Sequence, residues 1–98
     1  MSGTALITGA TEGIGRATAF ALGRTGYRVG VCARSAGPLE ALLSDLRAAG
    51  ITAAGQPADV GDPVAVNQLV NLVSDRLGPV DVLVNNGGIA ILKPFAEL

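Results

Sequence analysis

The chain has 98 residues, of which 49% are hydrophobic and 15% charged, and its net charge is −1. A chain with so many apolar and so few charged residues is unlike a disordered segment, and its length suits one folded domain. The near-neutral charge balance argues against nucleic acid or an anionic membrane as a partner.

The residue content also argues against metal and disulfide chemistry. Cys32 is the only cysteine and histidine is absent, so no disulfide can form within the chain and we expect no metal site. We expect Cys32 to be a small buried strand residue. Met1 leads into an apolar strand without a basic segment or a long apolar run, which favours a cytoplasmic protein with no signal peptide or membrane span.

The first predicted element is a short apolar strand over residues 5–7. Glycines then recur at positions 9, 13 and 15, and a helical apolar pattern begins at Ile14. A strand that passes through a glycine-rich turn into a helix directs the unpaired N–H groups of the helix, and its positive dipole end, at one point. Such a point favours a phosphate.

Each of the three glycines has a mechanical reason to lack a side chain. Gly9 can leave the strand with a backbone angle that residues with a β-carbon rarely adopt. Gly13 allows a pyrophosphate to approach the backbone, and Gly15 allows the helix to lie close to the strand. The spacing G-x-x-x-G-x-G differs from the common G-x-G-x-x-G, so a glycine-rich turn without a ligand is the alternative.

The first helix is predicted to pack on the sheet through one apolar face and to end at Gly26. That face consists of Ile14, Ala17, Ala21 and Leu22. Residues 27–33 then predict a second strand that is buried on both sides.

The second helix is predicted to open at Gly37-Pro38, where proline needs no N–H donor, and to close at Gly50. Its apolar stripe consists of Leu39, Leu42, Leu43 and Leu46. Residues 51–58 give a weaker strand, because Gly55 and Pro57 interrupt it.

Asp62-Pro63 is an N-cap residue followed by proline and predicts the start of a third helix, which Gly78-Pro79 ends. Its apolar positions recur with helical periodicity at Val66, Leu69, Val70, Val73 and Leu77.

Residues 80–84 predict a fourth strand, and the last ten residues read as a loop in which residues 95–98 are compatible with the start of another helix. Strands and helices therefore alternate as β-α-β-α-β-α-β. Right-handed crossovers then give an α/β fold, a parallel sheet with helices on both faces.

With these residues placed, the chain resembles the N-terminal part of the short-chain dehydrogenase/reductase family over nearly its whole length. Residues 8–15 resemble the T-G-x-x-x-G-I-G cofactor loop, and Asp59-Val60 the acidic dipeptide after the third strand. Residues 81–88 resemble the D-x-L-V-N-N-A-G segment, with Gly87 in place of alanine. Residues 31–34 resemble the second-strand end of members that use NADPH, including ketoreductases.

The resemblance implies a Rossmann-type, doubly wound sheet of strand order 3-2-1-4, with residues 1–98 forming an NAD(P)-binding domain that is incomplete at its C-terminus. In the longer order 3-2-1-4-5-6 the fourth strand is interior, so we expect residues 82–84 to form an unpaired apolar edge. The cofactor-binding residues that the motifs imply are Gly9, Thr11, Glu12, Gly13, Ile14, Gly15, Arg34, Asp59, Val60, Asn86 and Gly87.

No catalytic residue is assigned in this chain. The family uses a serine and a Tyr-x-x-x-Lys, whereas Tyr27 is the only tyrosine here, Val31 stands four residues on, and Lys93 is the only lysine. The resemblance therefore implies an oxidoreductase that acts on a small carbonyl or alcohol substrate through a missing half, with this chain inactive alone. Family members are commonly homo-oligomers, and we expect the same here.

The end of the second strand favours NADP(H) over NAD(H). An acid there would bind the ribose hydroxyls of NAD, but this position is Ala33. Arg34 follows, and its fork of donors suits a 2′-phosphate, although a plain surface arginine is the alternative. Glu12 opposes the assignment, because NADPH-preferring members often carry a basic residue there.

Two other hypotheses stay open. One is a non-catalytic module of the same fold that binds a dinucleotide. The other is a methyltransferase-type nucleotide domain, which is disfavoured because such domains also carry an acid at the position of Ala33. A serine and a Tyr-x-x-x-Lys beyond residue 98 would distinguish the enzyme from the binding module.

Overall fold

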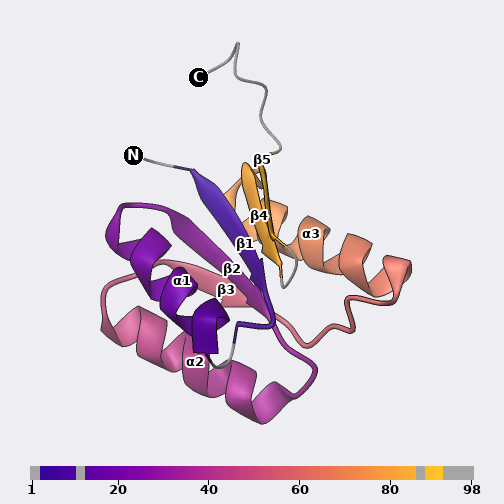
Figure 1. Ribbon diagram of the computed structural model, residues 1–98, viewed down its shortest axis with the longest axis horizontal. Helices are drawn as coiled ribbons and strands as arrows, with labels where there is room; N and C mark the ends of the chain where they lie inside the picture. The colour runs from indigo at the N-terminus through magenta and orange to yellow at the C-terminus, as the bar shows by residue number, and fades with distance from the viewer. Residues whose placement is uncertain (1–2, 11–12, 86–87, 92–98) are drawn as a thin grey trace.

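The computed structural model describes residues 3–10, 13–85 and 88–91 (Figure 1). Its elements are β1 (Thr4–Thr8), α1 (Gly13–Arg24), β2 (Arg28–Cys32), α2 (Ala36–Ala48), β3 (Ala53–Gly55), α3 (Pro63–Leu77), β4 (Val82–Asn85) and β5 (Gly88–Ile91). They build a sheet of order β3-β2-β1-β4-β5. Its first four strands are parallel, which confirms the predicted order 3-2-1-4.

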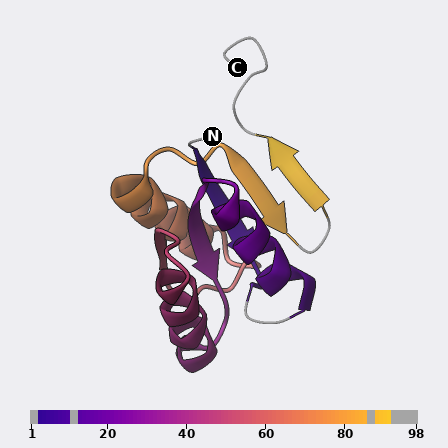
Figure 2. The same ribbon diagram turned by 90° about the vertical axis from the view of Figure 1, so that its left-hand side faces the viewer.

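Helices cover both faces of the sheet, α1 and α2 on one face and α3 on the other (Figure 2). Successive strand residues point to opposite faces. In β1, Ala5 and Ile7 join the cluster under α1 and α2, whereas Leu6 joins the cluster under α3. Because both faces are buried, the central residues of the parallel strands are apolar or glycine, as expected for a parallel sheet.

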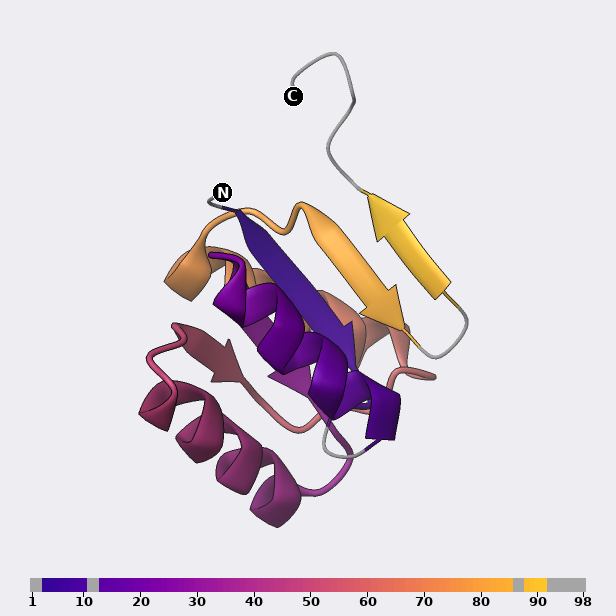
Figure 3. The ribbon, with the colours of Figure 1, turned by 60° about the vertical axis from the view of Figure 1, so that its left-hand side comes forward.

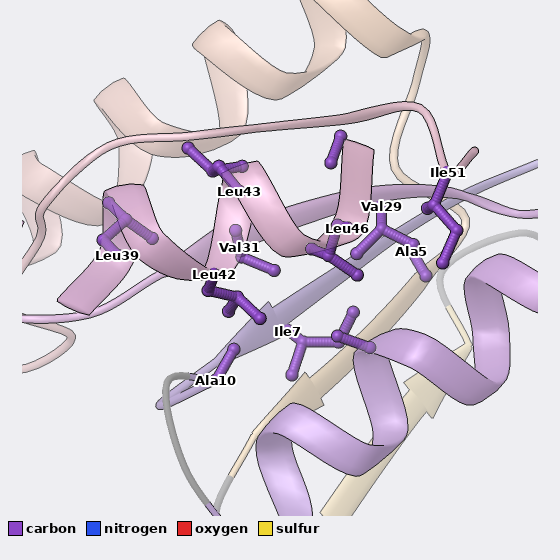
Figure 4. Close-up of a cluster of buried hydrophobic side chains, with 12 residues drawn as sticks. Ala5, Ile7, Ala10, Val29, Val31, Leu39, Leu42, Leu43, Leu46 and Ile51 are labelled. Atoms are coloured by element: carbon purple, nitrogen blue, oxygen red, sulfur yellow. The ribbon is translucent and has the colours of Figure 1, made fainter. Parts of the chain in front are cut away.

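The leucine stripe of α2 is confirmed as a core face. Its side chains point toward Val29 and Val31 of β2 and toward Ile7 of β1 (Figure 4). All four are buried: Leu39, Leu42, Leu43 and Leu46. This cluster holds α2 against the half of the sheet that contains β2 and β3.

Helix α3 is fixed at both ends by hydrogen bonds, of which the sequence predicts only the one at the N-terminus. The Asp62 side chain accepts a hydrogen bond of 3.0 Å from the Val64 N–H, as predicted for an N-cap. At the other end the Leu77 carbonyl accepts from the Thr4 hydroxyl at 2.9 Å and from the Arg28 side chain. The carboxyl end of α3 is thereby tied to the first residues of β1 and β2.

The predicted face of α1 is wrong. Ile14 is 86% exposed, Ala17 and Ala21 are also exposed, and only Leu22 is half-buried. The helix therefore turns most of its predicted apolar stripe to solvent.

The residues of α1 in closest contact with the rest of the fold are small instead, and Phe20 and Leu22 beside them also pack against the core cluster. Ala19 is fully buried, and Gly15 and Gly23 lie one turn before and one turn after it. An added Cβ on Gly23 would stand 2.6 Å from two carbons of the Ile51 side chain. Hydrophobic periodicity gives glycine little weight, so it missed a face on which contact depends on the absence of side chains.

The outer edge of β4 is paired rather than free, which corrects the expected open edge and the expected loop after it. β5 runs antiparallel to β4, with Val82 opposite Ile91 and Val84 opposite Ile89. The sequence carried a hairpin signal, Asn86-Gly87, between two apolar runs. Residues 95–98, the suggested helix start, lie outside the described residues.

The opposite edge strand is short. β3 covers Ala53–Gly55 rather than the predicted residues 51–58, and it pairs only with residues 29–31 of β2. The Arg47 side chain donates a hydrogen bond of 3.0 Å to the Ala53 carbonyl. Within the described ranges, none of the helices has the length and apolar character needed to cross a bilayer.

The contact between β2 and α3 gives a test of the packing. An added Cβ on Gly30 would lie 2.8 Å from both methyl groups of Val73 and 3.3 Å from a Leu6 methyl. We expect Gly30→Ala to lower the free energy of unfolding by about 1–3 kcal/mol, because α3 must move off the sheet. The urea midpoint of the protein measures this change.

Gly37→Ala is the matched control, because an added Cβ on this exposed residue of α2 meets no described residue within 4 Å apart from its chain neighbours. Alanine is the better helix former, whereas a Cβ directly before Pro38 disfavours the helical conformation. These two effects offset each other, so this variant should stay close to the parent protein in stability. Equal urea midpoints for the two variants would contradict the packing account.

Candidate functional site

The predicted site residues follow strands that end at one edge of the sheet. Thr8 of β1 lies opposite Cys32 of β2, and Val31 of β2 lies opposite Gly55 of β3. The loops after β1, β2 and β3 therefore emerge side by side (Figure 3). In an open α/β sheet this carboxyl edge is where ligands bind.

The glycine-rich turn has the geometry that the sequence predicts. Gly9 and Gly13 have φ angles of 61° and 62°, a region that favours glycine. Among the described residues, an added Cβ on Gly13 meets no atom within 4 Å apart from its chain neighbours, so these residues leave open space beside the first residue of α1. An added Cβ on Gly15 would collide with the Gly9 carbonyl oxygen, so the helix packs tightly against the turn.

These features fit a bound diphosphate. The first N–H groups of an α-helix have no partner within the helix, and its dipole favours an anion at that end. Gly13 is the first residue of α1 and has no side chain, so a phosphate can approach the backbone at this end of the helix. Thr11 and Glu12, which the motif also names, lie outside the described residues.

The turn is anchored on its inner side. Ala10 is fully buried, and its N–H donates a 3.4 Å hydrogen bond to the Cys32 carbonyl. Cys32 is buried as predicted, and its burial raises the pKa of the thiol, against a smaller opposite effect of a hydrogen bond with the Gly9 backbone. The thiol therefore stays protonated at neutral pH and acts as packing under the turn.

A hollow of about 150 Å³ opens on the α1 side of the carboxyl edge. Ile14, which is 86% exposed, is one of the residues that line it. The lining residues are Ile7, Thr8, Ile14, Gly15, Thr18, Val84 and Asn85.

A larger hollow of about 370 Å³ lies on the α3 side and contains the predicted residue Val60, which is 54% exposed. Its walls are mostly apolar side chains of α3 and of the strands. The lining residues are Leu6, Thr8, Val60, Val66, Leu69, Val70, Leu83 and Asn85.

Thr8 and Asn85 line both hollows, although neither was selected as a site residue. Both residues belong to the motifs at residues 8–15 and 81–88 and stand at the ends of β1 and β4, and this position could have predicted that they line the site. Nothing in the sequence predicts the same for Thr18. Its hydroxyl donates a 2.7 Å hydrogen bond to the Ile14 carbonyl one turn earlier.

Arg34 and Asp59 form a second group at the same edge. Their side chains are 82% and 58% exposed, and Arg34 Nη2 lies 3.7 Å from Asp59 Oδ1. The loops that carry them are joined by a 3.0 Å hydrogen bond from the Ala58 N–H to the Ala33 carbonyl. Two residues that the sequence assigns to one nucleotide are thus brought into contact.

The remaining predicted residues, Asn86 and Gly87, lie outside the described part of the chain. In the part that is described, no group of three His, Cys, Asp or Glu side chains is arranged to hold a metal ion. The site that the structure offers is thus a backbone-lined helix end with an exposed arginine nearby, which suits a phosphorylated nucleotide.

Comparison with known proteins identifies relatives of this chain. The profile of the short chain dehydrogenase family matches residues 3–98. A solved structure of a variant actinorhodin polyketide ketoreductase with NADPH has a TM-score of 0.83 and 50% identity and covers 87% of this chain. An alcohol dehydrogenase of the archaeon Thermococcus sibiricus, complexed with 5-hydroxy-NADP, has a TM-score of 0.77 and 36% identity and covers 85%.

A curated relative, the 3-oxoacyl-(acyl-carrier-protein) reductase of Synechocystis sp., is 43% identical over 86 residues, which is 87% of this chain. The chain spans about a third of the length of these proteins, 33% of the ketoreductase, 36% of the alcohol dehydrogenase and 35% of the Synechocystis reductase.

The tight contact at Gly15 generates a prediction for binding. Gly15→Ala should weaken nucleotide binding about five- to 150-fold, because a methyl group placed against the Gly9 carbonyl displaces the turn at a cost of about 1–3 kcal/mol. Titration of the protein with NADPH as the probe, followed by its fluorescence, measures the change. Gly37→Ala is again the control, and an unchanged affinity for Gly15→Ala would contradict the role of the close contact.

Proposed function

Because the chain belongs to the short-chain dehydrogenase family, we propose that it is the cofactor-binding part of an oxidoreductase that transfers a hydride between NADP(H) and a carbonyl or alcohol substrate. The observation that carries the proposal is the open space beside Gly13 at the start of α1, at the same sheet edge as Arg34. A ketoreductase 50% identical to this chain was solved with NADPH, which supports the proposal.

In this proposal the backbone of the turn binds the diphosphate. Gly9 and Gly13 supply the positive φ angles of the turn, and Gly15 keeps α1 close to it. Ile14 forms a wall of the hollow on the α1 side. The bound nicotinamide supplies or accepts the hydride, and the residues of this chain hold and orient the dinucleotide.

The adenosine end is assigned to the second group of residues. Arg34 would bind the 2′-phosphate, Asp59 would approach the adenine amino group, and Val60 would line the pocket nearby. The exposure of the Arg34 guanidinium leaves it accessible to an incoming phosphate. The roles of Thr11, Glu12, Asn86 and Gly87 rest on the family resemblance alone.

Catalysis and substrate binding are proposed to come from the rest of the protein. Tyr27, the only tyrosine of the chain, precedes β2 and so lies at the amino edge of the sheet, away from the site. That placement makes the non-catalytic dinucleotide-binding module the second candidate. We propose a small carbonyl or alcohol substrate, and a homo-oligomer as the assembled form.

A hydride-transfer experiment separates the two candidates. The whole protein should oxidise NADPH that carries deuterium at both hydrogen positions of nicotinamide C4 in the presence of a β-ketoacyl thioester or a ketone. The alcohol product should then carry one deuterium on its carbinol carbon. Mass spectrometry of the product detects the transfer. Tight NADPH binding with no label transferred to any carbonyl compound would favour the binding module.

Arg34→Ala tests the cofactor preference. This variant should lose about 1.5–3 kcal/mol of NADPH binding, the range for a hydrogen bond to a charged group, and should keep its affinity for NADH. Titration of the whole protein with each cofactor measures the two affinities. Arg76→Ala, in the last turn of α3, removes the same charge far from the site and serves as control. An equal loss for both cofactors would remove Arg34 from the specificity role.

A further inference from the structure

We propose that Asp59 tunes the preference for a 2′-phosphorylated nucleotide by competing with the phosphate for the Arg34 guanidinium. This inference rests on the proposed function, and it makes Asp59 a specificity-determining residue through Arg34 rather than through the adenine alone. The observation behind it is the ion pair, 3.7 Å from Arg34 Nη2 to Asp59 Oδ1.

The backbone around the pair holds the two residues together. Ala58 donates its N–H to the Ala33 carbonyl at 3.0 Å, so the residues that follow, Asp59 and Arg34, leave neighbouring strand ends side by side. This hydrogen bond fixes the spacing of the two Cα atoms more firmly than the side-chain contact could.

The carboxylate is the fixed member of the pair. Asp59 Oδ1 accepts a 2.9 Å hydrogen bond from the Gly61 N–H, and the Asp59 carbonyl accepts one of 3.0 Å from the Asp62 N–H. The Arg34 side chain is 82% exposed. Within the described part of the chain, its guanidinium forms one ion pair, the one with Asp59. The arginine is therefore the member that moves when a ligand arrives.

A phosphate that binds the Arg34 guanidinium must either share it with Asp59 or replace the ion pair between the two residues. Exposed ion pairs are weak, so releasing the arginine in advance should strengthen 2′-phosphate binding by no more than about fivefold. A nucleotide without that phosphate does not need Arg34 and gains nothing. Asp59 thus keeps the preference for NADP(H) smaller than Arg34 alone would make it.

Asp59→Asn is the suitable variant, because its amide oxygen can still accept from the Gly61 N–H and from an adenine amino group while the charge is lost. The probes are 2′,5′-ADP and 5′-AMP, which differ only in the 2′-phosphate and need no catalytic residue. Calorimetric titration of the whole protein at low salt gives both affinities. Asp75→Asn, in the last turn of α3 at the other edge of the sheet, controls for a general change in net charge.

We expect Asp59→Asn to raise the ratio of the 2′,5′-ADP affinity to the 5′-AMP affinity about two- to fivefold, because any change at the adenine amino group affects both probes equally. The gain in this ratio should disappear as salt screens the pair. In an Arg34→Ala background the same substitution should leave the ratio unchanged. A gain that persists without Arg34, or an equal gain for 5′-AMP, would overturn the proposed competition.

A loss of affinity for 2′,5′-ADP that 5′-AMP does not share would show that Asp59 orients Arg34 for the phosphate instead, and would also overturn the proposed competition. The proposed function fails separately: a parent protein that binds neither 2′,5′-ADP nor 5′-AMP would refute the nucleotide site itself, and the inference with it. Binding of both probes by the parent with no change in Asp59→Asn would refute the inference alone.

Discussion

The close approach of α1 to the sheet is the constraint on which the rest of the site depends. It is possible because Gly15, Ala19 and Gly23 present almost no side chain to β1 and to Ile51. The same approach brings the first turn of α1 against the Gly9 carbonyl, so helix packing and the shape of the ligand turn are set by one contact. A helix held further out by larger residues would move its N-terminal N–H groups away from the strand end.

The architecture could be predicted from sequence because it rests on long, repeated patterns. The stripe of α2, the Asp62 cap of α3 and the alternation of strands and helices are each signalled by several residues, and all are found. The face of α1 could not be predicted in the same way, since a pattern of hydrophobic residues gives no signal for a surface defined by glycines. β5 was missed for another reason, because the general strand order outweighed the local hairpin signal at Asn86-Gly87.

The candidate site could likewise be predicted from the sequence only in part. The positive φ at Gly9 follows from local chemistry and could be stated in advance. The contact between Arg34 and Asp59 could not, because they are 25 positions apart and belong to separate motifs, and only the pairing of β2 with β3 makes them neighbours. Sequence motifs name the residues around a nucleotide, whereas the sheet decides which of those residues also act on each other.

The pairing of β5 with β4 has a consequence for how the sheet can grow. A strand has two hydrogen-bonding edges, and β4 uses one for β1 and the other for β5. A further parallel strand can join this side of the sheet next to β4 only by peeling β5 away and exchanging one set of backbone hydrogen bonds for another. The hairpin thus covers the outer row of N–H and C=O groups of β4 and shields this row from intermolecular pairing.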